Sequence, residues 1–82
     1  MSEIFKSEVT LSENGFLFDH GSGLTYTLNT TGQFIFRQLQ SGQKSKQIME
    51  KMLDEFEVIE ETARKDLDDF FRQLNELGLI DL

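Results

Sequence analysis

The spacing of the apolar residues changes once along this chain, at Asn29, and that change limits the fold more than any other feature of the sequence. Before Asn29, short runs in which apolar and polar residues alternate are separated by turn residues, which is the pattern of β-strands. After Asn29, apolar residues recur every three or four positions, as they do in helices that bury one face. The sequence therefore predicts an α+β fold in which a three-stranded antiparallel meander precedes three helices.

The predicted strands are joined by turns that contain glycine. Asn14-Gly15 lies between the first two strands and Gly21-Ser22-Gly23 between the second and third, and these glycines supply the positive φ that such turns need. In the third strand, apolar and hydroxyl side chains alternate, so one of its faces is expected to be half-buried. The strands are predicted at residues 9–11, 16–18 and 24–28.

The three predicted helices are amphipathic. Thr30 or Thr31 can cap the first helix, and Ser45 can cap the second. The third, at about residues 60–77, has the most regular pattern and is followed by Gly78, a residue typical of helix C-termini. Its core-facing residues are expected to be Ala63, Leu67, Phe70 and Leu74.

A chain of 82 residues without cysteine has to fold on its apolar core alone. One domain over residues 1–82 accommodates all predicted elements, and eight Phe with no Trp suggest a core made largely of aromatic rings and Leu. The lack of cysteine excludes disulfides and thiolate chemistry and fits a reducing compartment. Because no targeting signal and no apolar run near the ~18 residues of a membrane span is present, we expect a cytoplasmic protein without a membrane partner.

No set of residues has the spacing that catalysis or metal binding needs. His20 is the single histidine, and its neighbours Asp19 and Ser22 belong to the same predicted turn, whereas a hydrolytic triad is brought together by the fold. The acidic stretch at residues 54–61 lacks the alternating acids and the central glycine of a calcium loop. We therefore expect a protein that is not an enzyme and has no catalytic residue, no cofactor and no metal.

The third strand is an edge of the predicted sheet, and no charged residue protects it. The other edge, the first strand, has Lys6, Glu8 and Glu13 nearby, whereas residues 21–36 contain no charge. An uncharged edge is either covered by the protein's own helices or left open for a strand from another chain. The sequence pattern is compatible with both alternatives.

Phe71 departs from the pattern of the last helix. It lies on the shoulder of the core stripe, beside Arg64, Asp68 and Asn75, where the other residues are polar. Phe71 either widens the core stripe or forms the floor of a groove between this helix and a neighbouring element.

Three segments of the chain have a characteristic order and spacing. Leu28-Asn29-Thr30-Thr31-Gly32 runs into Phe34-Ile35-Phe36, Glu55-Phe56-Glu57-Val58 closes the second predicted helix, and Glu76-Leu77-Gly78-Leu79-Ile80 closes the third. In this arrangement the chain resembles the PqqD-like proteins, the peptide chaperones of pyrroloquinoline quinone biosynthesis. Their fold recurs as the recognition element for ribosomally made, modified peptides. The resemblance runs from about residue 15 to residue 80.

The resemblance implies a winged-helix-like fold in which the leader of a precursor peptide adds as a strand to the third strand and lies against the third helix. The chain would then be a non-catalytic module that presents this leader to a separate modifying enzyme, such as a radical SAM enzyme. Tyr26→Pro is expected to weaken binding by removing a main-chain donor. The implied peptide-binding residues are Leu24, Thr25, Tyr26, Thr27 and Leu28 on the strand, and Arg64, Leu67, Asp68 and Phe71 on the helix.

The sequence also departs from the family pattern. Thr30 stands where such proteins often have Pro, and Phe36 stands where they often have Trp; both changes are conservative for the fold. Asp68 falls where many relatives have an apolar residue, so the helix side of the cleft is expected to be more polar and its peptide different.

Two other functions are compatible with the same predicted elements. A protein-interaction or homodimerisation module of winged-helix type would pair through the same strand edge, so monomer and homodimer both remain open. A winged-helix nucleic-acid binder needs a basic helix, but the last helix has three basic and six acidic residues in a chain of net charge −7. No nucleic-acid partner is therefore expected.

Overall fold

The strands form a meander because glycines allow the chain to reverse between them. The computed structural model describes residues 5–6 and 8–80. Its strands β1 (Val9–Leu11), β2 (Phe16–Asp19) and β3 (Leu24–Thr27) make an antiparallel sheet in the order β1-β2-β3. Gly15 and Gly23 have φ of 87° and 80°, a region that Gly enters without steric cost. The predicted meander is confirmed, with β2 one residue longer and β3 one residue shorter than expected.

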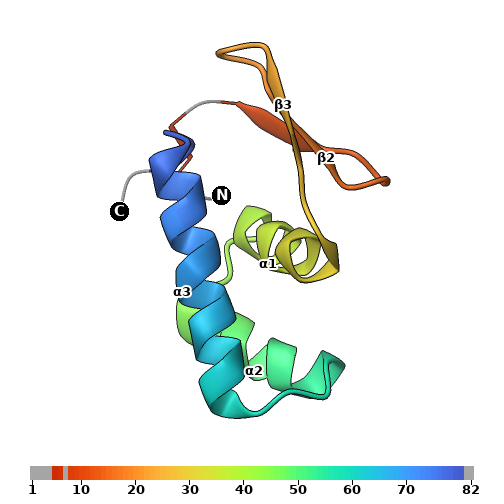
Figure 1. Cartoon of the computed structure of the whole chain (residues 1–82), viewed down its shortest axis with the longest axis vertical. Coiled ribbons are helices and arrows are strands. Elements are labelled where there is room, and N and C mark those ends of the chain that lie inside the picture. The colour runs from red at the N-terminus through yellow and green to blue at the C-terminus, as the bar shows by residue number, and fades with distance from the viewer. Residues whose placement is uncertain (1–4, 7, 81–82) are drawn as a thin grey trace.

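Three helices follow the sheet, and each buries one side. In Figure 1, α1 crosses below the sheet. α3 runs past α1 with one end near the sheet, and α2 lies at the other end of α3, far from the sheet. This order of elements confirms the predicted α+β fold. The helices are α1 (Thr30–Gln40), α2 (Ser45–Glu55) and α3 (Glu60–Glu76).

The cap of α1 differs from the predicted one. Asn29, and not Thr30 or Thr31, occupies the cap position, and its side-chain oxygen accepts the N–H of Gly32 at 2.8 Å. The extended backbone of Asn29 places this oxygen over N–H groups that have no partner inside the helix. The two threonines are instead the first residues of the helix itself.

The ends of the other helices are close to the predicted positions. Ser45 begins α2 and does not cap it, because Lys44 precedes the helix and its N–H donates to the Gln47 side chain at 2.9 Å. α3 ends one residue earlier than expected, and Gly78 follows with a positive φ of 77°, as a C-terminal glycine should.

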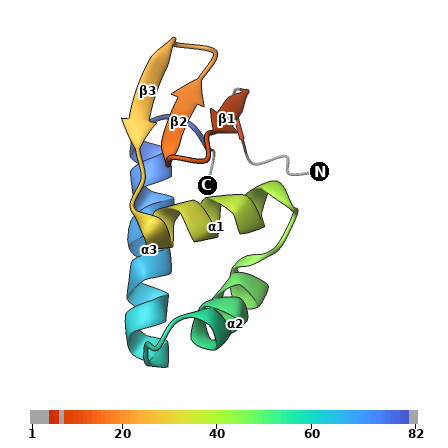
Figure 2. The same ribbon diagram turned by 90° about the vertical axis from the view of Figure 1, so that its right-hand side faces the viewer.

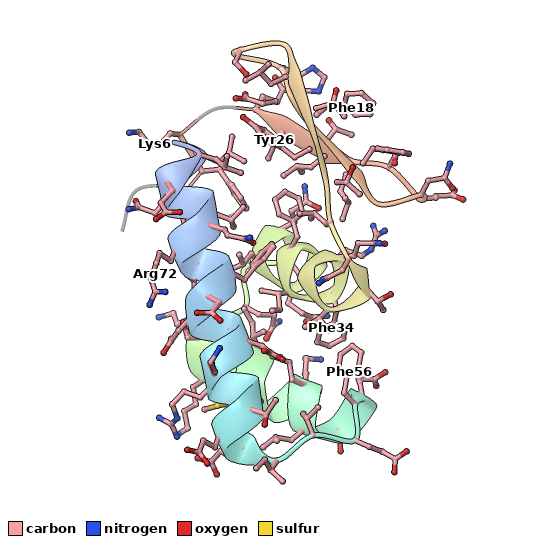
Figure 3. All side chains as sticks on the ribbon, viewed as in Figure 1. Lys6, Phe18, Tyr26, Phe34, Phe56 and Arg72 are labelled. Atoms are coloured by element: carbon pink, nitrogen blue, oxygen red, sulfur yellow. The ribbon has the colours of Figure 1, made fainter. Side chains whose placement is uncertain are left out.

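The core lies between the helices and one face of the sheet. It is more aliphatic than expected, because only Phe36 and Phe70 of the eight Phe are buried, while Phe16 and Phe18 are each 43% exposed. Phe34 and Phe56 are half-buried and meet edge to face between α1 and α2, with ring centroids 5.2 Å apart (Figure 3). The four predicted core residues of α3 are all buried. The buried apolar residues are Leu17, Ile35, Phe36, Leu39, Ile48, Met52, Ala63, Leu67, Phe70, Leu74, Leu79 and Ile80.

The two ends of the described chain meet beside the core, which the sequence did not indicate. Phe5 forms an isolated antiparallel bridge with Ile80, and the N–H of Lys6 donates to the carbonyl of Leu79 at 2.8 Å. The ring of Phe5 also contacts the ring of Phe36, with centroids 5.2 Å apart. These contacts hold the segment before β1 against the turn after α3.

The arrangement of the sheet places β3 on the side of α3. Figure 2 shows β3 at the left, β2 in the middle and β1 at the right, with α3 behind and below β3. The unpaired edge of β3 therefore borders the space next to α3, and the unpaired edge of β1 lies on the opposite side. Within the described residues, no helix has the length and apolar character needed to cross a membrane.

Candidate functional site

β3 has one edge to which no strand of the described chain is paired. Across the β2–β3 pair, the N–H of Leu28 donates to the carbonyl of Gly15 at 2.9 Å. Hydrogen-bonded and non-hydrogen-bonded positions alternate along an antiparallel pair, so Tyr26 also directs its main-chain groups to β2. The main-chain N–H and C=O groups of Thr25 and Thr27 consequently point to the open edge. These two residues are the positions to which an added strand can bond.

The two faces of β3 have different surroundings. Thr25 pairs with Phe18 and Thr27 with Phe16, so these four side chains share one face of the sheet. This is the outer face, because Phe16 and Phe18 are exposed while Leu17 between them is buried, and Figure 3 shows Phe18 turned away from the helices. The other face is the inner one. Its residues on this segment are the half-buried Tyr26 and Leu28 and, nearest the hairpin tip, Leu24, which is 55% exposed.

A hollow of about 560 Å³ lies between the beginning of α1 and one side of α3. Asn29, two residues after the end of β3, is the lining residue nearest to that strand in the sequence. The buried side chains of Ile35 and Phe70 contribute to its lining, and polar residues surround them. The polar lining residues are Asn29, Thr31, Asp66, Asp69, Arg72, Gln73 and Glu76.

The hollow occupies only one of the two shoulders of α3. Successive residues of an α-helix are rotated by about 100°, so the residue before a core position and the residue after it lie on opposite shoulders. Asp66, Asp69 and Gln73 each precede a core residue, and all three line the hollow. The residues that each follow a core residue, and therefore lie on the other shoulder, are Arg64, Asp68 and Phe71.

The lining of the hollow begins at Asn29, the residue after Leu28, but it contains none of the predicted strand residues and none of the predicted helix residues. Leu67 is a core residue, 4% exposed. Arg64 forms an exposed ion pair with Glu60 at 2.7 Å, and Phe71 is half-buried and packs against the core. Arg64, Asp68 and Phe71 thus do not line the hollow, and the packing of Phe71 against the core fits the wider core stripe.

The sequence does not show on which side of α3 the hollow lies, because mostly polar residues flank the core residues of this helix on both sides. Phe71 drew attention to its own shoulder as the one apolar residue among polar neighbours. Gly32 is a signal for the side on which the hollow lies: a Cβ there would lie 3.1 Å from the Phe70 ring and 3.2 Å from Asn29 Oδ1. Glycine at this position lets α1 approach α3 closely beside the hollow.

The residues around His20 stabilise the turn between β2 and β3. Asp19 is buried, and its carboxylate accepts the N–H of Gly21 at 3.0 Å and the hydroxyl of Ser22 at 2.9 Å. The His20 ring instead forms a hydrogen bond with the Thr10 hydroxyl at 2.9 Å. Histidine, aspartate and serine are therefore not aligned as a triad. Among the described residues, no three His, Cys, Asp or Glu are grouped so that they could hold a metal ion.

Comparisons with known proteins identify the family of the chain and solved structures with the same fold. The family described as "Coenzyme PQQ synthesis protein D (PqqD)" matches residues 14–80. One similar solved structure is "TbiB1 in Complex with the TbiA(beta) Leader Peptide", with a TM-score of 0.84, 24% identity and coverage of 99% of this chain and 95% of that one. Another is "Lasso peptide synthetase B1 complexed with the leader peptide", with a TM-score of 0.78, 26% identity and coverage of 92% and 89%. No curated protein matches the chain.

Proposed function

The chain belongs to the PqqD family, and from this membership we propose that it binds the leader of a ribosomally made precursor peptide as a strand added to β3. Domains of this family are non-catalytic peptide-binding modules, so the expectation that the chain is not an enzyme is confirmed. The observation that carries the proposal is the pair of main-chain positions at Thr25 and Thr27, which face an uncharged strand edge.

Strand addition suits the chemistry of this edge. Thr25 and Thr27 each offer one N–H and one C=O, and such main-chain bonds supply affinity that does not depend on the peptide sequence. Side chains of an added strand alternate between the two faces. Those opposite Tyr26 and Leu28 would point inwards towards α3, and those opposite the two threonines would lie beside Phe16 and Phe18. The inward-pointing set would give the module its selectivity.

The proposed site therefore includes the strand residues that the sequence predicted, but it uses a different side of α3 from the predicted one. It comprises Leu24, Thr25, Tyr26, Thr27 and Leu28, together with the α3 shoulder that lines the hollow, in place of Arg64, Asp68 and Phe71. The likeness of the fold to two proteins solved with leader peptides supports this proposal.

The partner after peptide capture would be a separate modifying enzyme. By analogy within the PqqD family, a radical SAM enzyme is the proposed class. A cytoplasmic location fits the absence of cysteine, and the acidic α3 is unfavourable for a nucleic-acid partner.

The proposal is tested at Thr25, where the main-chain donor and the side chain can be changed separately. The isotopically labelled chain would be titrated with synthetic leaders of short precursors encoded next to its gene, with amide shifts expected in β3 and along the hollow. Thr25→Pro removes an edge donor without removing a β2–β3 bond, and should weaken binding by about tenfold or more. The control Thr25→Val keeps the N–H and should change affinity by less than about twofold.

A folded Thr25→Pro variant that binds as tightly as the wild type would rule out strand addition here. Tyr26→Pro is a poorer test than the sequence suggested, because the Tyr26 N–H points to β2 and its loss would disrupt the hairpin itself.

The open edge also supports a second candidate, a homodimer in which two copies pair through β3. Sedimentation of the free chain together with hydrogen exchange separates the two functions. A concentration-dependent dimer in which the Thr25 and Thr27 amides are protected would favour the homodimer. A monomer with rapidly exchanging amides at these positions would favour peptide capture.

A further inference from the structure

We infer that the hollow beside Asp66 selects peptides that present a Lys or Arg side chain on the inward face of the added strand. This inference rests on the proposed strand addition and deepens it, because it names the chemistry of the peptide that the module accepts.

One inward-pointing side chain of the added strand would reach the hollow. A residue opposite Leu28 would share the inner face with Leu28, since directly opposed residues of neighbouring strands point to the same side. The hollow starts at the next residue, Asn29, and extends to α3. An inward side chain at this end of the added strand is therefore the one that reaches it.

The lining of the hollow fits a side chain with an apolar stem and a cationic end. Ile35 and Phe70 provide apolar contact, while Asp66 and Glu76 provide carboxylates on the α3 side. Lys and Arg bury their methylene stems against apolar groups and keep the charged end at a polar rim. A volume of about 560 Å³ is within the range of pockets that hold small ligands, so it has room for one long side chain with its water.

Two of the carboxylates, those of Asp66 and Glu76, form no ion pair with any described residue. Asp69 is paired with Lys65 at 3.2 Å and with Arg72 at 3.4 Å, so its charge is already balanced. Among the described residues, neither Asp66 nor Glu76 takes part in a salt bridge. Asp66 is also half-buried, which makes a compensating cation more favourable than it is at a fully exposed acid.

The opposite wall of the hollow supplies no cation either. It comes from Asn29 and from Thr31, Gly32 and Ile35 at the beginning of α1, which lie within the uncharged residues 21–36. Arg72 is the one basic residue in the lining, and it is engaged with Asp69. A positive charge that neutralises Asp66 at this site would therefore come from the bound peptide.

The experiment uses a library of random 15-residue peptides displayed on phage and selected on the immobilised full chain. Selected peptides are expected to shift the amides of β3 and to contain Lys or Arg several times more often at one aligned position than the unselected library does. Replacing that residue by Met should weaken binding to the wild type by about tenfold, the effect of one lost charge-assisted contact.

Charge reversal on the protein distinguishes a local effect at the hollow from an effect of the net charge of the chain on peptide affinity. Asp66→Lys should weaken the selected peptides by about tenfold or more, and peptides with Glu at the aligned position should recover most of that loss. Asp68→Lys makes the same change in net charge on the other shoulder of the same helix and should alter affinity by less than about twofold. Asp66→Asn provides a second, nearly isosteric variant should Asp66→Lys fail to fold.

The outcomes distinguish this inference from the proposed function. Peptides that bind at β3 without enrichment of Lys or Arg, or equal effects of Asp66→Lys and Asp68→Lys, would overturn the basic-residue preference and leave strand addition intact. If the selected peptides shift no β3 amide, both proposals fail together.

Discussion

Asn29 serves two purposes at the point where β3 passes into α1. Its side-chain oxygen caps the helix through Gly32, and the residue also lines the hollow at the end of the strand edge. Gln33 strengthens the same junction, because its side-chain amide donates to the carbonyl of Leu28 at 3.0 Å. A few local hydrogen bonds therefore fix the angle between the strand that would receive a peptide and the helix that forms one wall of the hollow.

Stability measurements can assign the α1 cap to one residue. Asn29→Ala removes the acceptor for the Gly32 N–H and should lower the free energy of unfolding by about 1 kcal/mol. For a domain of this size that corresponds to a fall in Tm of about 4–8 °C. Thr30→Ala is the matched control, since the threonine at this position is exposed and is not the cap. Urea denaturation in which Thr30→Ala costs more than Asn29→Ala would contradict this assignment.

At the scale of the elements, the spacing of apolar residues predicts which side of a helix or strand is buried, but not which element packs next to it. The core stripe of α3 follows from its residue spacing alone, and all four predicted residues are buried. Which shoulder of α3 faces β3 depends on how the helix returns past the sheet, and no local pattern encodes that path. Phe16-Leu17-Phe18 posed a similar problem: three apolar residues in a row do not reveal that Leu17 points inwards and both rings point outwards.

A pair of substitutions on α3 tests the assignment of its shoulders. Phe71→Ala removes a half-buried ring that packs on the core, so it should lower the free energy of unfolding by about 1–3 kcal/mol and leave peptide affinity nearly unchanged. Gln73→Ala changes an exposed residue of the hollow and should do the reverse, with stability within about 0.5 kcal/mol of the wild type and weaker peptide binding. Calorimetric titration of both variants with one leader peptide would show whether the two effects separate. The opposite pattern would place the peptide on the Phe71 shoulder.

At the scale of the whole molecule, the two edge strands of the sheet differ in their surroundings, because the two ends of the described chain meet on the β1 side. On the β1 side, the segment before β1 is held by its bridge to Ile80 and by the contact between the Phe5 and Phe36 rings. No such contact between chain ends lies on the β3 side within the described residues, and the edge of β3 borders the space next to α3. Long-range contacts of this kind escape sequence analysis, because Phe5 lies outside any periodic segment and its partner is 75 residues away.

This asymmetry predicts that stability and peptide binding can be changed independently. Phe5→Ala would remove the ring contact with Phe36 and loosen the pairing with Ile80, so it should lower the free energy of unfolding by about 2 kcal/mol. The Lys6 amide, which donates to Leu79, should then exchange faster with solvent, while the affinity for a leader peptide should stay within about twofold, because Phe5 lies on the β1 side of the sheet, away from β3. Lys6→Ala is the control: its side chain is exposed and its main-chain bond is kept, so neither quantity should change. If Phe5→Ala weakened peptide binding tenfold under conditions where the chain remains folded, the two sides of the sheet would have to be coupled, and the division into a structural edge and a binding edge would not hold.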